Sequence, residues 1–258
     1  MKKAKLNMIE LLSIDVSNYC SKQCDFCYNH SSKEGNYLWL QEELVSFAVD
    51  CVNNGIKAIS LGGGEPFEYD GIFEIIDKLQ PIVYLSITTN GLPLENKKVW
   101  ENLLQHKPDK IHITIHHPEN DTEVERVFKR IESISNIDIK AGLNLLVAND
   151  KIEECKNVYR KMRNILTPDQ IILVPQRFSK TPLPKELAYI VGNEPFQSPS
   201  CLLQCKRPDN FVSVSWNKMV NSCSYAGGKE KLLSLDYKGL VEALQKVVFT
   251  SCEKSAVL

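Results

Sequence analysis

The sequence contains no apolar run of the roughly 20 residues that a transmembrane helix needs. Its first residues, MKKAKLNMIELLSIDV, begin with basic side chains, but Glu10 and Asp15 interrupt the apolar segment, so we expect no signal peptide. Neither sign of charge is in excess, because 31 Lys and Arg stand against 32 Asp and Glu. These absences predict a soluble cytoplasmic protein whose partners include neither a membrane nor a nucleic acid.

Cysteine, by contrast, is plentiful, with nine in 258 residues. The cytoplasm is reducing, so structural disulfides are not expected, and metal or cluster ligands are the better interpretation. Cys51 and Cys155 are exceptions, because each lies in a predicted helix far in sequence from other thiols. We interpret these two as small apolar core residues.

Strand-like and helix-like segments alternate through the first two thirds of the chain. Such alternation predicts parallel strands joined by helical crossovers, with the unusual residues gathered where strands end. We therefore expect an α/β fold, a partial (β/α)6 barrel of the TIM type. The predicted strands are 8–16, 57–61, 82–89, 110–115, 138–147 and 170–175, and the predicted helices are 40–54, 71–79, 95–105, 122–134 and 150–166.

The rhythm breaks near residue 175. The proline-rich stretch 178–200 is interpreted as a linker. Residues 211–224 alternate around Asn217-Lys218 like a short hairpin, and 232–249 fits a last helix that Gly239 weakens. The predicted division is a core over 1–177, the linker, and a small C-terminal module over 201–258.

The stretch CSKQCDFC places three thiols in one short charged loop, at Cys20, Cys24 and Cys27. A disulfide needs two cysteines and a closed zinc site usually has four ligands, so three ligands leave one position on a metal or cluster open. Iron–sulfur clusters and zinc both remain candidates at this point.

A second motif, SLGGGEP, follows the second predicted strand. Gly62, Gly63 and Gly64 allow close approach of the backbone to a ligand, and Glu65 adds a carboxylate before Pro66. Alone this is a weak turn signal, but beside a loop of three thiols it becomes specific.

Together, CSKQCDFC and GGGEP resemble the radical S-adenosylmethionine (SAM) superfamily, whose hallmark is CxxxCxΦC with an aromatic Φ, here Phe26. The resemblance implies a [4Fe–4S] cluster held by the three cysteines, with SAM on the fourth iron. It implies reductive cleavage to a 5′-deoxyadenosyl radical, which takes a hydrogen atom from the substrate, and a reductant of flavodoxin or ferredoxin type.

The resemblance also implies the cofactor contacts. Gly63, Gly64 and Glu65 match the element that contacts the methionine amino group, and Phe26 would lie near the adenine or beside the cluster loop. Residues that end later strands would touch the ribose, carboxylate or adenine: Thr89, Asn90, Thr114, Asn144, and 174–177. For Thr89-Asn90-Gly91 a plain turn is an equal alternative. His116 and His117 depart from the family pattern, and either an acid–base role or a solvated loop fits them.

Four further cysteines lie in the C-terminal module: Cys201, Cys205, Cys223 and Cys252. Their pattern of cysteine, hairpin and cysteine resembles a twitch or SPASM-type extension, which implies a second, auxiliary [4Fe–4S] cluster. Structural zinc is the alternative. In a mixed case Cys252 is a thiol hydrogen donor instead of a ligand.

These features predict a radical SAM enzyme of oxidoreductase type, most simply one that oxidises, crosslinks or epimerises a ribosomally made peptide. Because only a few residues precede the first predicted strand, we expect no separate peptide-recognition domain, and a small-molecule dehydrogenase acting on an aminocyclitol is the alternative. A zinc-binding protein or an electron carrier is the non-catalytic alternative. Activating enzymes for glycyl radicals share the first motif but lack the hairpin-linked cysteines. The sequence does not identify catalytic residues beyond the cofactor site.

Overall fold

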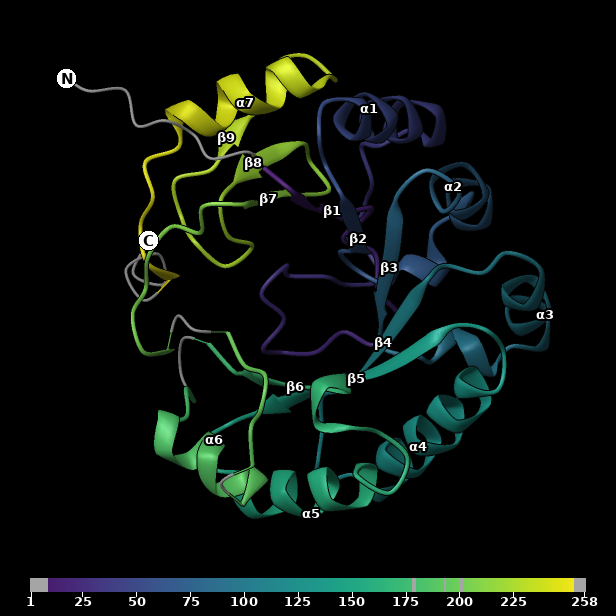
Figure 1. Ribbon diagram of the computed structural model, residues 1–258, viewed down its shortest axis with the longest axis vertical. Coiled ribbons are helices and arrows are strands. Elements are labelled where there is room, and N and C mark those ends of the chain that lie inside the picture. The colour runs from purple at the N-terminus through teal and green to yellow at the C-terminus, as the bar shows by residue number, and fades with distance from the viewer. Residues whose placement is uncertain (1–8, 178–179, 193, 200–201, 253–258) are drawn as a thin grey trace. The chain divides into compact units, whose positions relative to one another are not determined.

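Figure 1 shows the computed structural model, which describes residues 9–177, 180–192, 194–199 and 202–252. The chain forms two compact units. The first comprises Met1–Ile87, His106–Pro108 and Lys206–Leu258, and the second comprises Thr88–Gln105 and Asp109–Cys205. The first unit thus joins the C-terminal residues to the N-terminal strands.

The first unit is built on three parallel strands in the order of the chain. They are β1 (Leu11–Asp15), β2 (Ala58–Gly62) and β3 (Tyr84–Thr89), of which the last two residues belong to the second unit. Between them run α1 (Gln41–Asn53), the 3-10 turn η1 (Pro66–Glu68) and α2 (Ile72–Leu79). Helix α1 buries Leu44, Phe47, Ala48 and Cys51, a spacing of three and four residues that produces one apolar face.

The C-terminal hairpin extends this sheet. Strand β7 (Phe211–Val214) pairs in parallel with β1, on the edge that β2 does not occupy. Strands β8 (Met219–Asn221) and β9 (Glu230–Lys231) continue it in antiparallel fashion. Lys218 has a positive φ of 62° in the turn, which confirms the predicted hairpin at Asn217-Lys218.

Helix α7 (Tyr237–Lys246) is shorter than the predicted 232–249. The carboxylate of Asp236 accepts the backbone N–H of Gly239 at 2.6 Å, so Asp236 is the N-cap and Gly239 lies in the first turn. Leu232 is outside the helix, and its N–H donates to the carbonyl of Lys218 at 2.9 Å.

The second unit repeats the strand and helix alternation. Strands β4 (Lys110–Ile115), β5 (Lys140–Val147) and β6 (Ile171–Pro175) are parallel neighbours. Figure 1 shows α4 (Asp121–Ser135) and α5 (Ile152–Met162) along one side of these strands. The unit also contains η2 (Pro93–Glu95), α3 (Lys97–Gln105) and η3 (Pro168–Gln170). The predicted α/β fold with six alternating parallel strands is confirmed.

One helix was not predicted. Residues 178–200 were interpreted as a linker, but α6 (Pro184–Val191) forms within them. Pro184 occupies the first turn, where proline is tolerated because its missing N–H has no intrahelical partner. The Glu186 carboxylate accepts the N–H of Leu183 at 2.6 Å and closes the start of the helix.

Cys51 and Cys155 are fully buried. Burial raises the pKa of each thiol to about 12. Their interpretation as core residues is therefore confirmed. Over the described part of the chain, no helix combines the length and apolarity that crossing a membrane requires.

Candidate active site

The three-cysteine loop lies between β1 and α1, in the first unit. The N–H of Cys20 donates to the carbonyl of Ser32 at 2.9 Å, which ties the first cysteine to the far end of the loop. The N–H of Cys27 donates to the carbonyl of Cys24 at 3.0 Å, so the second and third cysteines flank one turn that contains Phe26. Cys20 is buried, whereas Cys24 and Cys27 are half-buried.

The GGGEP element is joined directly to the residues before this loop. The N–H groups of Gly64 and Glu65 donate to the carbonyls of Ser17 and Tyr19 at 2.7 and 2.8 Å. A Cβ on Gly64 would lie 1.9 Å from the Tyr19 oxygen, and Gly63 has a φ of +116°. Two of the glycines predicted to approach a ligand, Gly63 and Gly64, therefore approach the chain's own backbone. The two motifs form one hydrogen-bonded junction.

Two glutamates accept hydrogen bonds from backbone N–H groups at this junction. Glu65 is fully buried, and its Oε1 accepts the N–H of Phe67 at 3.1 Å. Glu68 Oε2 accepts the N–H of Ser21 at 2.9 Å, inside the cysteine loop. Burial, and to a lesser extent these two carboxylates, raise the pKa of the Cys20 thiol. Cys20 therefore remains protonated at neutral pH until a bound metal cation displaces the thiol proton.

The donor set fits an iron–sulfur cluster in its chemistry, because three soft thiols come from one short, hydrogen-bonded loop. In the part of the chain that the structure describes, no three His, Cys, Asp or Glu side chains converge as a preformed metal site. The assignment therefore rests on donor chemistry and loop geometry.

Thr89 and Asn90 belong to the second unit, where they are buried at the end of β3. Thr89 Oγ1 accepts the N–H of Gly91 at 2.9 Å, and Asn90 Oδ1 accepts the N–H of Leu92 at 2.8 Å. The turn that the sequence offered as an alternative is thus present. Because both side chains hold the turn, any contact with a cofactor would be additional.

Thr114 and Asn144 are direct neighbours in the parallel register of β4 and β5. Both are half-buried on the same face, and the next residues in this row are His112 and Gly142.

Beyond β4, the N–H of His116 donates to Glu123 at 2.7 Å, and Glu123 is buried. Sequence reasoning had no signal for Glu123, which lies among the polar residues of α4.

The auxiliary cysteines are placed only in part. Cys201 lies outside the described residues, and Cys205 is exposed in the second unit. Cys223 and Cys252 are half-buried in the first unit. A β-bridge between Gly227 and Thr250 lays the segment that leads to Cys252 beside the turn that follows Cys223.

The two faces of the sheet in the first unit differ in polarity. One face carries fully buried aliphatic residues such as Ile14, Leu61 and Ile87. The other face carries a row of hydroxyls, because the register aligns four serines on neighbouring strands. They are Ser213, Ser13, Ser60 and Ser86. Asp15 follows Ser13 on this face, at the carboxyl end of β1.

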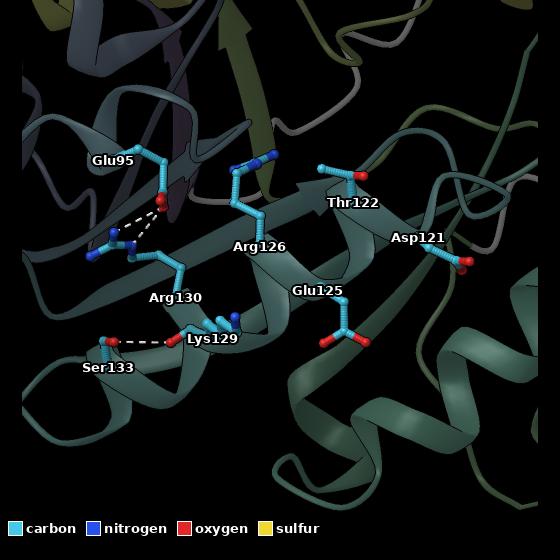
Figure 2. A pocket seen from close by; sticks show the side chains of 8 residues that line it. All are labelled: Glu95, Asp121, Thr122, Glu125, Arg126, Lys129, Arg130 and Ser133. Atoms are coloured by element: carbon cyan, nitrogen blue, oxygen red, sulfur yellow. Dashed lines mark hydrogen bonds and ion pairs between the residues drawn. The ribbon is translucent and has the colours of Figure 1, made fainter.

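A cavity of about 580 Å³ lies in the second unit. Figure 2 shows the side chains that line it. Side chains of both charges line it, and Arg130 donates to Glu95 at 2.9 Å within it. Its lining residues are Glu95, Asp121, Thr122, Glu125, Arg126, Lys129, Arg130 and Ser133. None of the described candidate site residues is among them, so we interpret this cavity as a solvated face of α4.

This chain matches its curated relatives over only part of their length. A probable GTP 3′,8-cyclase of Methanocaldococcus jannaschii is 28% identical over 177 residues, which are 64% of this chain and 58% of the relative. The GTP 3′,8-cyclase of Clostridium perfringens is 27% identical over 167 residues, 62% of this chain and 48% of the relative. The chain thus spans about half the length of the curated relatives it matches.

Solved structures share the fold at low identity. Streptococcus suis SuiB bound to its precursor peptide SuiA has a TM-score of 0.70 at 15% identity, covering 97% of this chain and 66% of that one. Native anSMEcpe with bound AdoMet has a TM-score of 0.63 at 15% identity, covering 92% and 82%. The profile of the "Radical SAM superfamily" matches residues 14–149, more than half of the chain. With both hallmark motifs inside that match, this chain belongs to the radical SAM superfamily.

Proposed function

We propose that this chain binds SAM through the junction of the cysteine loop and the GGGEP element, and uses it to abstract a hydrogen atom from a substrate. The observation that carries the proposal is the pair of hydrogen bonds from Gly64 and Glu65 to Ser17 and Tyr19. When bound, the cluster would supply the electron that cleaves SAM to methionine and a 5′-deoxyadenosyl radical.

Each element of the junction has a distinct task in this proposal. Cys20, Cys24 and Cys27 hold the cluster and leave one iron for the cofactor. Glu65 is oriented by its bond to the Phe67 N–H, so that its second oxygen accepts from the amino group of methionine. The buried setting strengthens this charge-assisted contact, because water does not compete for the carboxylate.

The remaining cofactor contacts are assigned to the adenosine and the methionine carboxylate. Phe26, within the turn between Cys24 and Cys27, would contact the adenine. Thr114 and Asn144, side by side on β4 and β5, offer a hydroxyl and an amide on one face. The backbone of the Thr89-Asn90 turn would contact the ribose, since the two side chains already hold the turn.

We further propose an auxiliary [4Fe–4S] cluster held by Cys201, Cys205, Cys223 and Cys252. The support is the Gly227–Thr250 bridge, which brings the segments carrying two of the four cysteines together. Such a cluster would accept an electron from the substrate radical and make the net reaction an oxidation. Structural zinc, or Cys252 as a hydrogen donor, are the competing assignments.

For the substrate we propose a peptide, as in the neighbour solved with its precursor peptide. The row of serines on the polar face of the first unit offers neutral hydrogen-bonding groups, which suit a peptide backbone. A nucleoside triphosphate carries several negative charges and requires clustered cations, and this row has none. The aminocyclitol alternative fits neutral hydroxyls as well.

A cyclase acting on GTP is the second candidate, because the curated relatives carry that name. One experiment separates the candidates. The reconstituted protein is incubated without oxygen with SAM and dithionite, and 5′-deoxyadenosine is counted after addition of GTP, of aminocyclitols, or of synthetic peptides encoded beside the gene. Stimulation by a peptide alone supports the proposal. Stimulation by GTP alone overturns the substrate assignment, and no 5′-deoxyadenosine under any condition overturns the whole proposal.

A further inference from the structure

Tyr28, the residue after the third cysteine, is held at both ends. Its hydroxyl donates a hydrogen bond to the carboxyl group of Asp15, the last residue of β1. Its ring packs against that of Tyr225, with centroids 4.7 Å apart and a tilt of 48°. A side chain fixed through both its polar tip and its ring has little freedom to move the backbone that carries it.

The acceptor end of this contact is rigid. Asp15 is 7% exposed and lies in the sheet, where its register partner on β2 is Gly62. The next residue, Val16, donates its N–H to the carbonyl of Gly62 at 2.9 Å. The Tyr28 hydroxyl is therefore anchored to the same strand ends that carry the GGGEP junction.

The ring partner comes from the other end of the chain. Tyr225 lies two residues after Cys223, in a turn closed by the bond from the Ala226 N–H to the Cys223 carbonyl at 3.3 Å. Asn221 fixes this turn, because its amide donates to the carbonyls of Ala226 and Gly227 at 2.7 and 3.1 Å. Asn221 is itself buried on β8.

We propose that Asp15 and Tyr225 are positioning residues that hold Cys27 in place through Tyr28. This inference rests on the proposed cluster at Cys20, Cys24 and Cys27, and it adds two residues that neither hallmark motif contains. It also means that the segment carrying Cys223 supports the ligand loop of the first cluster by direct contact. Cluster occupancy at the N-terminal site thus depends on the C-terminal hairpin.

A different arrangement would be expected if Tyr28 were only a core residue. The hydroxyl of a core tyrosine needs a partner, but a neutral backbone carbonyl suffices, whereas a buried carboxyl group is costly unless it serves a defined contact. Here the carboxyl accepts a hydrogen bond from the tyrosine hydroxyl, and the exposed residue Lys229 lies close enough to act on its charge. The contact therefore defines the position of Tyr28, which is half-buried.

The test measures the N-terminal cluster without relying on turnover. Full-length variants are reconstituted anaerobically and reduced, and the part of the [4Fe–4S] electron paramagnetic resonance signal that changes on SAM addition is quantified. Only a cluster with an open iron responds to SAM, so an auxiliary cluster with four protein ligands does not contribute. Iron per chain and the thermal melting of the unloaded protein are recorded in parallel.

We expect Tyr225→Ala and Asp15→Leu to lower the SAM-responsive signal by about threefold or more, given the usual energies of an aromatic pair and of a hydrogen bond. Tyr225→Phe keeps the ring and Asp15→Asn keeps an acceptor oxygen, so both should retain the signal. Tyr37→Ala is the matched control. Tyr37 also pairs with a tyrosine, Tyr69, at 5.2 Å, but lies ten residues after Cys27.

Full retention of the signal in both Tyr225→Ala and Asp15→Leu would overturn the inference. If Tyr225→Ala does not fold, Tyr225→Leu, which keeps apolar volume without a ring, decides in its place. An equal loss in Tyr37→Ala would also overturn it, because the effect would then not depend on contact with Tyr28. A wild-type chain without any SAM-responsive signal would overturn the proposed function itself, which is a distinct result.

Discussion

The backbone N–H of Glu65 donates to the carbonyl of Tyr19 at 2.8 Å, one residue before the first cysteine of the candidate cluster loop. This bond joins residues that lie 46 positions apart in the chain. It makes the cysteine loop and the GGGEP element a single structural feature. Loss of either part should therefore disturb the other.

Gly64→Ala tests this junction. The new Cβ would lie 1.9 Å from the Tyr19 oxygen, so the two backbones must separate. We expect a loss of about 2 kcal/mol or more in the free energy of unfolding, as for other forced overpacking. Iron bound after reconstitution should fall in parallel.

Gly62→Ala is the matched control, because its Cβ would meet nothing nearer than Asp15 Oδ1 at 3.8 Å. Denaturant unfolding followed by circular dichroism gives both values. Equal stability of the two variants would show that the close approach at Gly64 does not constrain the loop.

Asp15 should give the unloaded protein a distinctive pH dependence. Burial raises the pKa of its carboxyl from 3.8 to about 6, with Lys229 opposing the shift. The folded state therefore binds this proton more tightly than the unfolded state, and stability falls as pH rises from about 4 to about 6. The full shift corresponds to about 3 kcal/mol.

Asp15→Asn removes this titration. We expect the variant to be more stable than wild type at pH 7, and to lose that advantage at pH 4. Chemical denaturation of both proteins at the two pH values measures the difference. A constant difference across this range would contradict the assignment of the raised pKa to Asp15.

His112 and Gly142 provide a test in the second unit. A Cβ on Gly142 would lie 2.1 Å from His112 Cδ2, so Gly142→Ala should destabilise the protein by about 1–3 kcal/mol. The double variant His112→Ala with Gly142→Ala removes the obstructing ring. We expect a coupling energy of about 1 kcal/mol or more in the double-mutant cycle, and strictly additive effects would contradict the contact.

His112 also predicts acid sensitivity. Burial, aided by Lys110, lowers the pKa of its imidazole from 6.5 to about 4. The unfolded state takes up the proton first, so His112 contributes stability above pH 6.5 that is lost as pH falls towards 4. His112→Asn should reduce the slope of stability against pH in this window, and an unchanged slope would assign the acid sensitivity elsewhere.

Cysteine labelling distinguishes core thiols from candidate ligands. The thiols of Cys51 and Cys155 are fully buried with pKa values of about 12, so a brief pulse of iodoacetamide at pH 8 should leave them unmodified in the folded apo protein. The exposed residue Cys205 should react and serves as the internal control. Peptide mass spectrometry reads each site, and rapid labelling of Cys51 would contradict its burial.

Much of the fold follows from local patterns in the sequence. Apolar spacing of three and four residues in α1, and alternation in β4, place both elements within a few residues of their observed ends. The hairpin turn at Lys218 was also predictable, because turn chemistry is local. Helix α6 was missed because the proline that opens it was counted as a breaker.

The parts that escaped prediction depend on contacts between distant segments. No local pattern indicates that β7 pairs with β1, because any parallel edge would satisfy its backbone. Asp15 was considered only as an interruption of an apolar segment, since its role requires Tyr28 to fold back onto β1. The glycines of GGGEP were predicted to face a ligand, and only the structure shows that Gly64 faces Tyr19.

The most direct test of the central claim is an iron count after anaerobic reconstitution with iron and sulfide. It compares wild type, the variant Cys20→Ala/Cys24→Ala/Cys27→Ala, and the variant Cys201→Ala/Cys205→Ala/Cys223→Ala/Cys252→Ala. The account predicts about eight irons per wild-type chain and about four in each variant, one [4Fe–4S] cluster remaining each time. An iron content that does not fall in the first variant would contradict the assignment of Cys20, Cys24 and Cys27 as cluster ligands.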